Sequence, residues 1–337
     1  MALAKEKQEV TDMVTFMSYN STGINTVKTQ WISEICDEND VDYLSIQEHF
    51  KSTKSTDKFF RENFKDYYSY VIPGHRSPGQ DSGRAKAGLA HLSRKYLAIK
   101  NDRVVTHNFR IQAQVLNFPQ CRILWINSYF PTDPQTVNFD PTELVELLGE
   151  VENILANTEY NDVVWAGDLN WDMKRNSQFS NIVENFVAKL ELEPLWKHHI
   201  VDFTHLHTDN RSTSTLDHFL LSPRLLQLVS GAGVIHRGDN LSRHSPIWLS
   251  LDLGKIPIRN LVSRKTSIKP SWLKATADDI VNYTTTLESK LLSLATPQTL
   301  LCSDPHCADQ THSQERDHFM LDILSCILET SHTALPP

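Results

Sequence analysis

The segment DVVWAGDLN, residues Asp162–Asn170, combines a run of apolar residues with two polar residues at its end. The run, rich in β-branched residues, predicts a buried strand, and its polar end predicts the exit loop. Because successive side chains of an extended chain point to opposite sides, Asp168 and Asn170 are expected to face the same way. Such a pair can supply a charged and a neutral oxygen ligand, or an acceptor and an amide donor. Taken alone, it would more commonly be a turn that closes a strand.

Four other short polar motifs stand at the ends of strand-like runs. They are SYN at Asn20, QE at Glu48, TLDH at Asp217 and RHSP at His244. Polar groups at strand ends are where a β-rich scaffold builds a site. Two aspartates, a glutamate, two asparagines and a histidine suit a hard divalent metal and phosphate chemistry.

Glu48 and His244 indicate this chemistry most directly. A carboxylate at the inner end of a strand costs free energy unless it is paired, hydrogen-bonded or metal-bound, so Glu48 is a candidate Mg²⁺ ligand. A surface carboxylate is the alternative. His244 is a candidate general base because its ordinary pKa lies near neutrality, and Asp217 could hold one ring nitrogen. The alternative for His244 is a structural histidine.

Strand-like runs and amphipathic helical segments alternate between residues 13 and 253. Apolar residues three and four positions apart predict helices around 27–35, from Asp140-Pro141 to 154, and at 182–190. Several neighbouring strands lack a helix between them, which favours a layered α/β sandwich over a simple βαβ repeat. The expected strands are 13–19, 42–48, 67–72, 88–93, 110–118, 122–130, 162–170, and the segments TLDHFLLS and SPIWLSLDL.

The composition changes after Gly254-Lys255-Ile256-Pro257, which looks like a domain boundary. Helical patterns recur at 271–295 and 315–329. The chain stops at ALPP as if a longer polypeptide had continued, so an isolated fragment is expected. The expected parts are a flexible N-terminus (1–12), a main domain (13–253), a linker (254–270) and a helical tail (271–337).

A cysteine and histidine cluster lies between the two tail helices. Cys302, Cys307 and His312, with His306 or His318, could form a zinc knuckle. The Cys-x4-Cys-x4-His spacing lacks the tight Cys-x2-Cys pair typical of zinc sites, so a loop with reduced thiols is favoured.

The overall composition is that of a soluble globular protein. The 337 residues are 40% hydrophobic and 22% charged, with a net charge of -8, which is unlike a free-standing nucleic-acid binding module. A metal-dependent nuclease is less affected, because a bound cation inverts the local sign. The N-terminus lacks an apolar signal region, no apolar stretch is long enough to span a bilayer, and the five cysteines are few and odd in number. An intracellular, non-secreted protein without membrane partners is expected.

The ordered set of motifs over residues 13–253 resembles the endonuclease/exonuclease/phosphatase superfamily. That superfamily includes apurinic endonucleases, pancreatic-type deoxyribonucleases, inositol polyphosphate 5-phosphatases and sphingomyelinases. The resemblance implies a four-layer α/β/β/α sandwich with the site at one edge of the two sheets. It also implies metal-dependent attack of water on a phosphodiester, with Mg²⁺ as the cofactor and Mn²⁺ as an alternative.

Each motif residue receives a role from this resemblance. Asn20 and Glu48 correspond to the primary metal-site residues, and Tyr129, in NSYFP, to a tyrosine beside the scissile phosphate. Asp168 corresponds to the residue that orients or deprotonates the attacking water, and Asn170 positions phosphate. Asp217 corresponds to the partner of the catalytic histidine, His244.

One position departs from the superfamily pattern. Ser-Asp-His commonly precedes the final strand, but here Ser242-Arg243-His244 puts a cation in place of the aspartate. Either Arg243 turns outward or contacts phosphate and activity survives, or activity is weakened. The intact remaining set favours residual or normal activity. Arg84 and Lys86, in a basic loop, could also contact DNA phosphates, although a solvated loop is the simpler reading.

The tail resembles the segment after the endonuclease of LINE-type (non-long-terminal-repeat) retrotransposon polyproteins, where a reverse transcriptase follows. This resemblance implies an enzyme that nicks chromosomal DNA, with the DNA phosphodiester backbone as its partner and the nucleus as its location. A small-molecule or lipid phosphoesterase of the same fold, mildly favoured by the net acidity, is the rival hypothesis. A catalytically weakened retroelement relic is the third.

Overall fold

The computed structural model describes residues 12–52, 56–76, 85–97, 99–134, 139–209, 211–256, 272–297 and 310–336. The chain divides into two compact units, residues 1–264 and 265–337. The candidate site lies wholly in the first unit.

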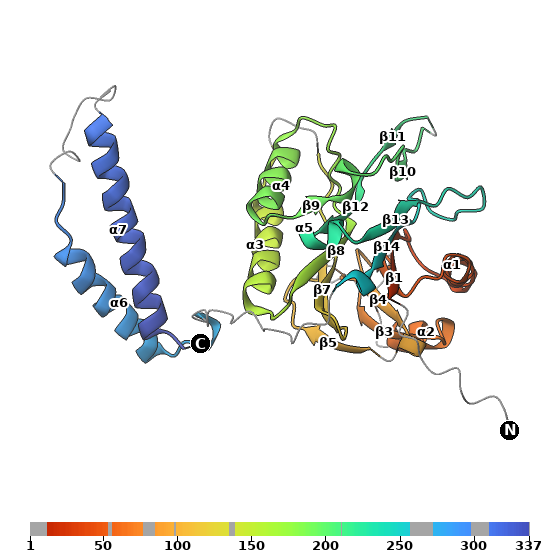
Figure 1. The fold of residues 1–337 in the computed structure, drawn as a ribbon, viewed down its shortest axis with the longest axis horizontal. Helices are drawn as coiled ribbons and strands as arrows, with labels where there is room; N and C mark the ends of the chain where they lie inside the picture. The colour runs from red at the N-terminus through yellow and green to blue at the C-terminus, as the bar shows by residue number, and fades with distance from the viewer. Residues whose placement is uncertain are drawn as a thin grey trace. The chain divides into compact units, whose positions relative to one another are not determined.

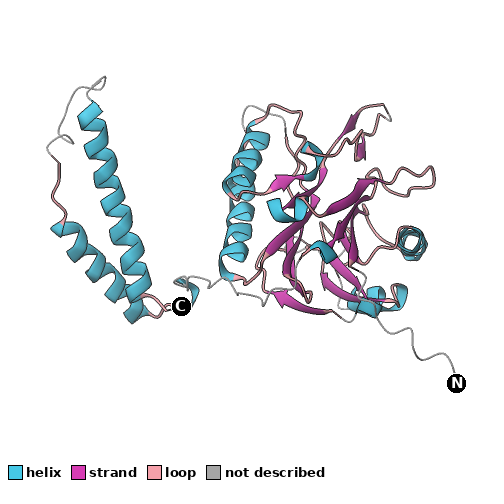
Figure 2. Cartoon of the chain, in the orientation of Figure 1, coloured by secondary structure: helices cyan, strands magenta, loops and turns pink. Residues whose placement is uncertain are grey.

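Two six-stranded mixed sheets form the centre of the first unit (Figure 2). The strand orders are β13-β14-β1-β2-β4-β3 and β5-β6-β7-β8-β12-β9. The first sheet comprises β1 (Met13–Asn20), β2 (Tyr43–Gln47), β3 (Tyr67–Ile72), β4 (Leu89–Arg94), β13 (Val229–Val234) and β14 (Ile247–Asp252). The second comprises β5 (Lys100–Val104), β6 (Ile111–Asn117), β7 (Arg122–Tyr129), β8 (Asp162–Asp168), β9 (Glu193–Pro194) and β12 (Asp217–Leu221). A separate two-stranded hairpin consists of β10 (His205–Leu206) and β11 (Thr213–Ser214).

Helices cover the outer face of each sheet (Figure 1). α1 (Thr26–Glu38) and α2 (Thr56–Asn63) pack on the first sheet, with Trp31, Ile32 and Phe60 in a shared apolar cluster. α3 (Thr142–Asn157) and α4 (Gln178–Lys189) pack on the second, where Leu147 and Val183 are fully buried. The remaining short helices are α5 (Pro223–Leu226), η1 (Lys95–Leu97), η2 (Leu195–Lys197) and η3 (Leu253–Lys255). The predicted four-layer α/β/β/α sandwich is therefore confirmed.

An apolar cluster joins the two sheets face to face. Phe16 and Tyr43 of the first sheet stack with ring centroids 5.0 Å apart, and both pack edge-on against Trp125 of the second. Toward one end this cluster gives way to buried amides, where Gln47 Nε2 donates to Asn127 Oδ1 across the sheets at 2.7 Å. Hydrogen bonds between buried amides help to fix the two sheets in one register, and this end carries the motif residues.

The strand directions explain why distant motifs meet. β1 runs parallel to β2, and β7 runs parallel to β8, so the carboxyl ends of each pair lie together. β12 and β14 run antiparallel to these strands, so it is their beginnings that reach the same end of the sandwich. Motifs that follow four strands and precede two others therefore converge.

Several elements lie outside the predicted pattern. α2 is only two turns long, and β5 (KNDRV) is an edge strand with few apolar residues. β13 (VSGAGV) is a largely half-buried edge strand with two glycines and a bulge. The hairpin β10–β11 has strands of two residues each. None of these segments buries a whole face, so none shows the hydrophobic alternation that marks a strand.

The second unit contains η4 (Trp272–Lys274), α6 (Ala277–Ser293) and α7 (Gln310–Ala334). The two helices correspond to the helical patterns at 271–295 and 315–329. A capping box between Thr276 and Asp279 begins α6. Cys302, His306 and Cys307 lie outside the described residues, and His312 lies in the first turn of α7. Within the described part of the chain, no helix is both long and apolar enough for a membrane span.

Candidate active site at one end of the sandwich

The strand register brings the motif residues together. Asp217, the first residue of β12, pairs directly with Asp168, the last residue of β8. Tyr129, the last residue of β7, is also opposite Asp168. Asn20 ends β1, and His244 lies just before β14.

Asn20 joins two carboxylates. Its buried side-chain amide donates to Glu48 Oε2 at 3.1 Å and to Asp168 Oδ2 at 2.8 Å. Its Oδ1 accepts from the backbone N–H of Thr22 at 3.0 Å. In this arrangement the Asn20 amide bridges the two carboxylates.

The backbone around these carboxylates adopts conformations that most residues avoid. Glu48 has φ +53° and Asn170 has φ +48°, both in the left-handed region. Backbone strain of this kind persists only where surrounding structure fixes it, and it gathers at functional sites. Gly167 has φ +150°, and a Cβ there would lie 2.0 Å from the carbonyl oxygen of Ser128. The glycine of GDLN is therefore required for β7 and β8 to approach.

His244 and Asp217 form a buried pair. His244 Nδ1 lies 2.8 Å from Asp217 Oδ2, and Nε2 lies 3.8 Å from Asp168 Oδ2. Burial alone would lower the pKa of the imidazole, but Asp217 and Asp168 outweigh it and raise the pKa of His244 to about 9. The proton on Nδ1 is held by Asp217, so Nε2 is the nitrogen that faces the carboxylate cluster.

Asp168 is a buried carboxylate, 2% exposed. Burial raises the pKa of its carboxyl, His244 opposes that rise, and the neighbouring Asp217 adds to it. Oδ1 accepts from the backbone N–H of Asn170 at 3.0 Å. The side-chain amide of Asn170 donates to the Phe130 carbonyl at 2.9 Å, which fixes the loop after β8.

Tyr129 is half-buried beside the same carboxylates. Burial, followed by the negative charges of Glu48 and Asp168, raises the pKa of its phenol above the ordinary value. Arg110 lies over the Tyr129 ring, with its guanidinium carbon 4.9 Å from the ring centroid. The phenol therefore stays protonated at neutral pH and can donate a hydrogen bond.

The donor set fits a divalent cation. Asp217 Oδ1 is buried without a hydrogen-bond partner, and Asp168, Asp217 and His244 offer ligand atoms within 4.8 Å of one another. Mg²⁺ prefers oxygen ligands and few carboxylates. The carboxylate oxygens of this end are ligands of that kind, whereas His244 Nδ1 already binds Asp217.

The three basic residues predicted to bind substrate are placed differently. Arg243 is exposed, and its guanidinium donates to the His207 carbonyl at 2.7 Å, so this contact directs it to the hairpin β10–β11. Lys86 is exposed. The carbonyl of the next residue, Ala87, accepts from the N–H of Phe50, which follows Glu48 by two residues. Arg84 lies outside the described residues.

Sequence reasoning missed two residues of this region, Thr204 and His205. Thr204 Oγ1 is buried and accepts from the N–H groups of Leu216 and Asp217, at 2.9 and 3.0 Å. The His205 ring lies against His244, with centroids 4.5 Å apart. Both lie in FTHLH, which has neither strand nor helix periodicity, so only the spatial proximity reveals them.

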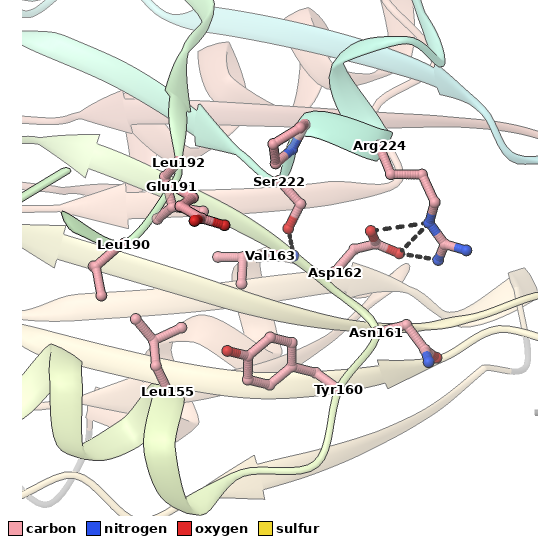
Figure 3. Close-up of a pocket in the computed structure, with 11 residues that line it drawn as sticks. Leu155, Tyr160, Asn161, Asp162, Val163, Leu190, Glu191, Leu192, Ser222 and Arg224 are labelled. Atoms are coloured by element: carbon pink, nitrogen blue, oxygen red, sulfur yellow. Dashed lines mark hydrogen bonds and ion pairs between the residues drawn. The ribbon is translucent and has the colours of Figure 1, made fainter. Parts of the chain in front are cut away.

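A prominent cavity lies elsewhere. It has a volume of about 510 Å³ and lies at the opposite end of β8, beside Asp162 (Figure 3). There the Arg224 guanidinium binds both carboxylate oxygens of Asp162. Of the two ends of β8, only the Asp168 end gathers several titratable side chains around one point.

The model of the endonuclease/exonuclease/phosphatase family matches residues 17–250, and the chain belongs to this family. No curated protein sequence gives a significant match. Among solved structures, an AP endonuclease from Leishmania major is similar, with a TM-score of 0.59 and 14% identity over 71% of this chain and 87% of that one.

Two further structures show the same fold. A 3'-5' exonuclease from Neisseria meningitidis has a TM-score of 0.55 and 14% identity, covering 71% of this chain and 100% of that one. The endonuclease domain of TRAS1, a telomere-specific non-LTR retrotransposon, has a TM-score of 0.53 and 14% identity, covering 72% and 99%. The predicted family is therefore confirmed, and the fold is that of phosphodiester hydrolases.

Proposed function

We propose that this protein is a Mg²⁺-dependent DNA endonuclease that hydrolyses a phosphodiester at the Asp168 end of the sandwich. The observation that carries the proposal is the convergence of Glu48, Asp168 and Asp217 around Asn20 and His244, from separate strands and loops. Carboxylates gathered without an arginine or lysine salt bridge are expensive unless a cation or a reaction uses them.

The metal would be held by the Glu48 carboxylate, which the Asn20 amide holds in place. When bound, Mg²⁺ would neutralise charge that develops on the phosphoryl oxygens. Asp168 would orient the attacking water and accept its proton. Asn170 would fix the loop that carries Asp168, a positioning role in place of the direct phosphate contact expected from the family.

His244 would face the phosphoryl group through Nε2. Two carboxylates within 4 Å favour its protonated form, so a cationic imidazole would stabilise the negative charge of the transition state. Asp217 would hold the ring by Nδ1, and the Tyr129 phenol would donate a hydrogen bond to a phosphate oxygen. These roles replace a simple general-base role for His244.

The DNA substrate is supported by resemblance and by the tail. The TRAS1 domain comes from a retrotransposon, and the two helices after residue 272 agree with a segment preceding a reverse transcriptase. We place the protein in retrotransposition, nicking target DNA in the nucleus. The alternative is a small-molecule or lipid phosphoesterase, which the net charge of -8 favours.

A substrate panel separates these functions. Purified full-length protein with Mg²⁺ is incubated with supercoiled plasmid, with inositol polyphosphates and with sphingomyelin vesicles. The proposal predicts nicked circular plasmid, and neither phosphate nor phosphocholine release. Release of phosphate or phosphocholine, with the plasmid left supercoiled, would support the phosphoesterase instead. EDTA and His244→Ala are the controls, because each should abolish a genuine activity of this site.

A further inference from the structure

The hairpin β10–β11 pairs with neither large sheet. A two-stranded hairpin is marginal in water on its own, so its position depends on contacts at its base. At its tip, Asp209 accepts from the N–H groups of Arg211 and Ser212, which makes the turn compact. What holds the hairpin to the body therefore determines where Thr204 and His205 lie.

The loop that carries His244 makes those contacts. The Leu206 N–H donates to the Arg243 carbonyl at 2.9 Å, and the Ser245 N–H donates to the Thr204 carbonyl at 2.8 Å. The Arg243 guanidinium adds a third bond, to the His207 carbonyl at 2.7 Å. The backbone and the side chain of Arg243 thus bind Leu206, the last residue of β10, and His207, which follows it.

We propose that Arg243 is a positioning residue that clamps the hairpin β10–β11 onto the His244 loop and so aligns the Asp217–His244 pair. The clamped strand places Thr204 Oγ1 under the N–H of Asp217 and the His205 ring against His244. The arginine replaces the family's carboxylate without entering the metal site, because the described contact of its head group is with the hairpin.

The clamp also explains how a cation is accommodated next to a catalytic histidine. Successive side chains of an extended chain point to opposite sides, so Arg243 and His244 leave the backbone in different directions. His244 turns inward to Asp217, whereas Arg243 is exposed. Arginine suits this role because its planar, always charged group keeps a directed bond to a carbonyl.

Hydrogen exchange tests the clamp without reference to activity. In Arg243→Ala, the amides of Leu206, His207 and Ser245 should exchange at least tenfold faster than in the wild type. Arg211→Ala is the matched control, since it removes a cation from the same hairpin but leaves the clamp, and its exchange should be unchanged. Unaltered exchange in a folded Arg243→Ala protein would overturn the proposal.

Kinetics test the consequence for the site, and this arm rests on the proposed function. Arg243→Ala should lower kcat about tenfold with little change in KM, and Arg243→Lys, which can still donate to the carbonyl, should recover part of the loss. Arg243→Asp, the family residue, should behave like Arg243→Ala. A gain of activity in Arg243→Asp would refute the clamp and indicate a damaged metal site. If the wild type nicks no DNA while the exchange effect is present, the proposed function fails and the clamp stands.

Discussion

The two ends of β8 carry the same residue type in different settings. Asp162 and Asp168 are both buried, at 1% and 2% exposed. They are six residues apart in one strand, which corresponds to about 20 Å. Asp162 binds Arg224 and lines a cavity of about 510 Å³. Asp168 binds an asparagine amide, lies near a histidine, and has two more carboxylates close by.

The difference shows what distinguishes a site from a stable ion pair. At the Asp162 end, the carboxylate is neutralised by Arg224, and the 510 Å³ cavity is lined by Tyr160 and Glu191 besides this ion pair. At the Asp168 end, neutralisation is incomplete and the backbone holds Glu48 and Asn170 at positive φ. Unneutralised buried charge therefore identifies the candidate site, whereas cavity volume does not; positive φ alone does not separate the two ends, because Glu191, which lines the cavity, also has φ +55°.

The largest expected effect is the loss of activity in His244→Ala. Removing the imidazole deprives the transition state of its cationic partner, and the nicking rate should fall by about 10³-fold, within the range for positioned catalytic groups. Rates under single-turnover conditions measure this. Arg224→Ala, at the other end of β8, should leave the rate per folded molecule unchanged. Equal losses in the two variants would remove the distinction between the ends.

A smaller effect concerns stability and pH in metal-free protein. The folded-state pKa of His244, about 9, lies above its ordinary value of 6.5. The stabilisation from its proton is therefore fully present below pH 6.5 and is lost as pH rises through about 9, by at most about 3 kcal/mol. Urea unfolding from pH 6 to 9.5 measures it, and the His244→Gln variant should show a flatter curve. The same slope in both proteins would contradict the assignment.

The smallest expected effect is that of Asp162→Asn on stability. The substitution removes the buried carboxylate charge that pairs with Arg224. Because the Arg224 side chain is about half exposed, solvent screening limits the loss of folding free energy to about 1–2 kcal/mol. Chemical denaturation measures it. Asp168→Asn should cost less or even stabilise, because it removes a charge that Asp217 and Glu48 repel. A greater loss in Asp168→Asn would reverse the comparison.

The sequence predicted the layers and the motif residues for one physical reason. Long apolar runs such as Asp162–Asp168 have to be buried, so the polar residues at their ends lie at the ends of the sheets. The structure brings Asn20, Glu48, Asp168, Asp217 and His244 together, as the ordered motifs led us to expect.

What the sequence left open depends on contacts without periodicity. Thr204 immediately precedes β10 and His205 begins it, and a strand of two residues shows no alternation. The direction of Arg243 depends on a backbone carbonyl, that of His207, which a one-dimensional pattern does not contain. The hydrogen bonds from Asn20 to two carboxylates follow from the orientation of its amide, which the sequence does not contain.

One measurement tests the central claim most directly: the Mg²⁺-dependent nicking rate of Asp168→Asn and of Asp162→Asn, on one supercoiled plasmid at equal concentrations of folded protein. The two substitutions are chemically identical and lie at opposite ends of the same strand. We expect Asp168→Asn to be at least about 100-fold slower than the wild type, as for loss of a catalytic proton acceptor. We expect Asp162→Asn to nick at the wild-type rate. Equal rates in the two variants, or a slower Asp162→Asn, would contradict the placement of the site at Asp168.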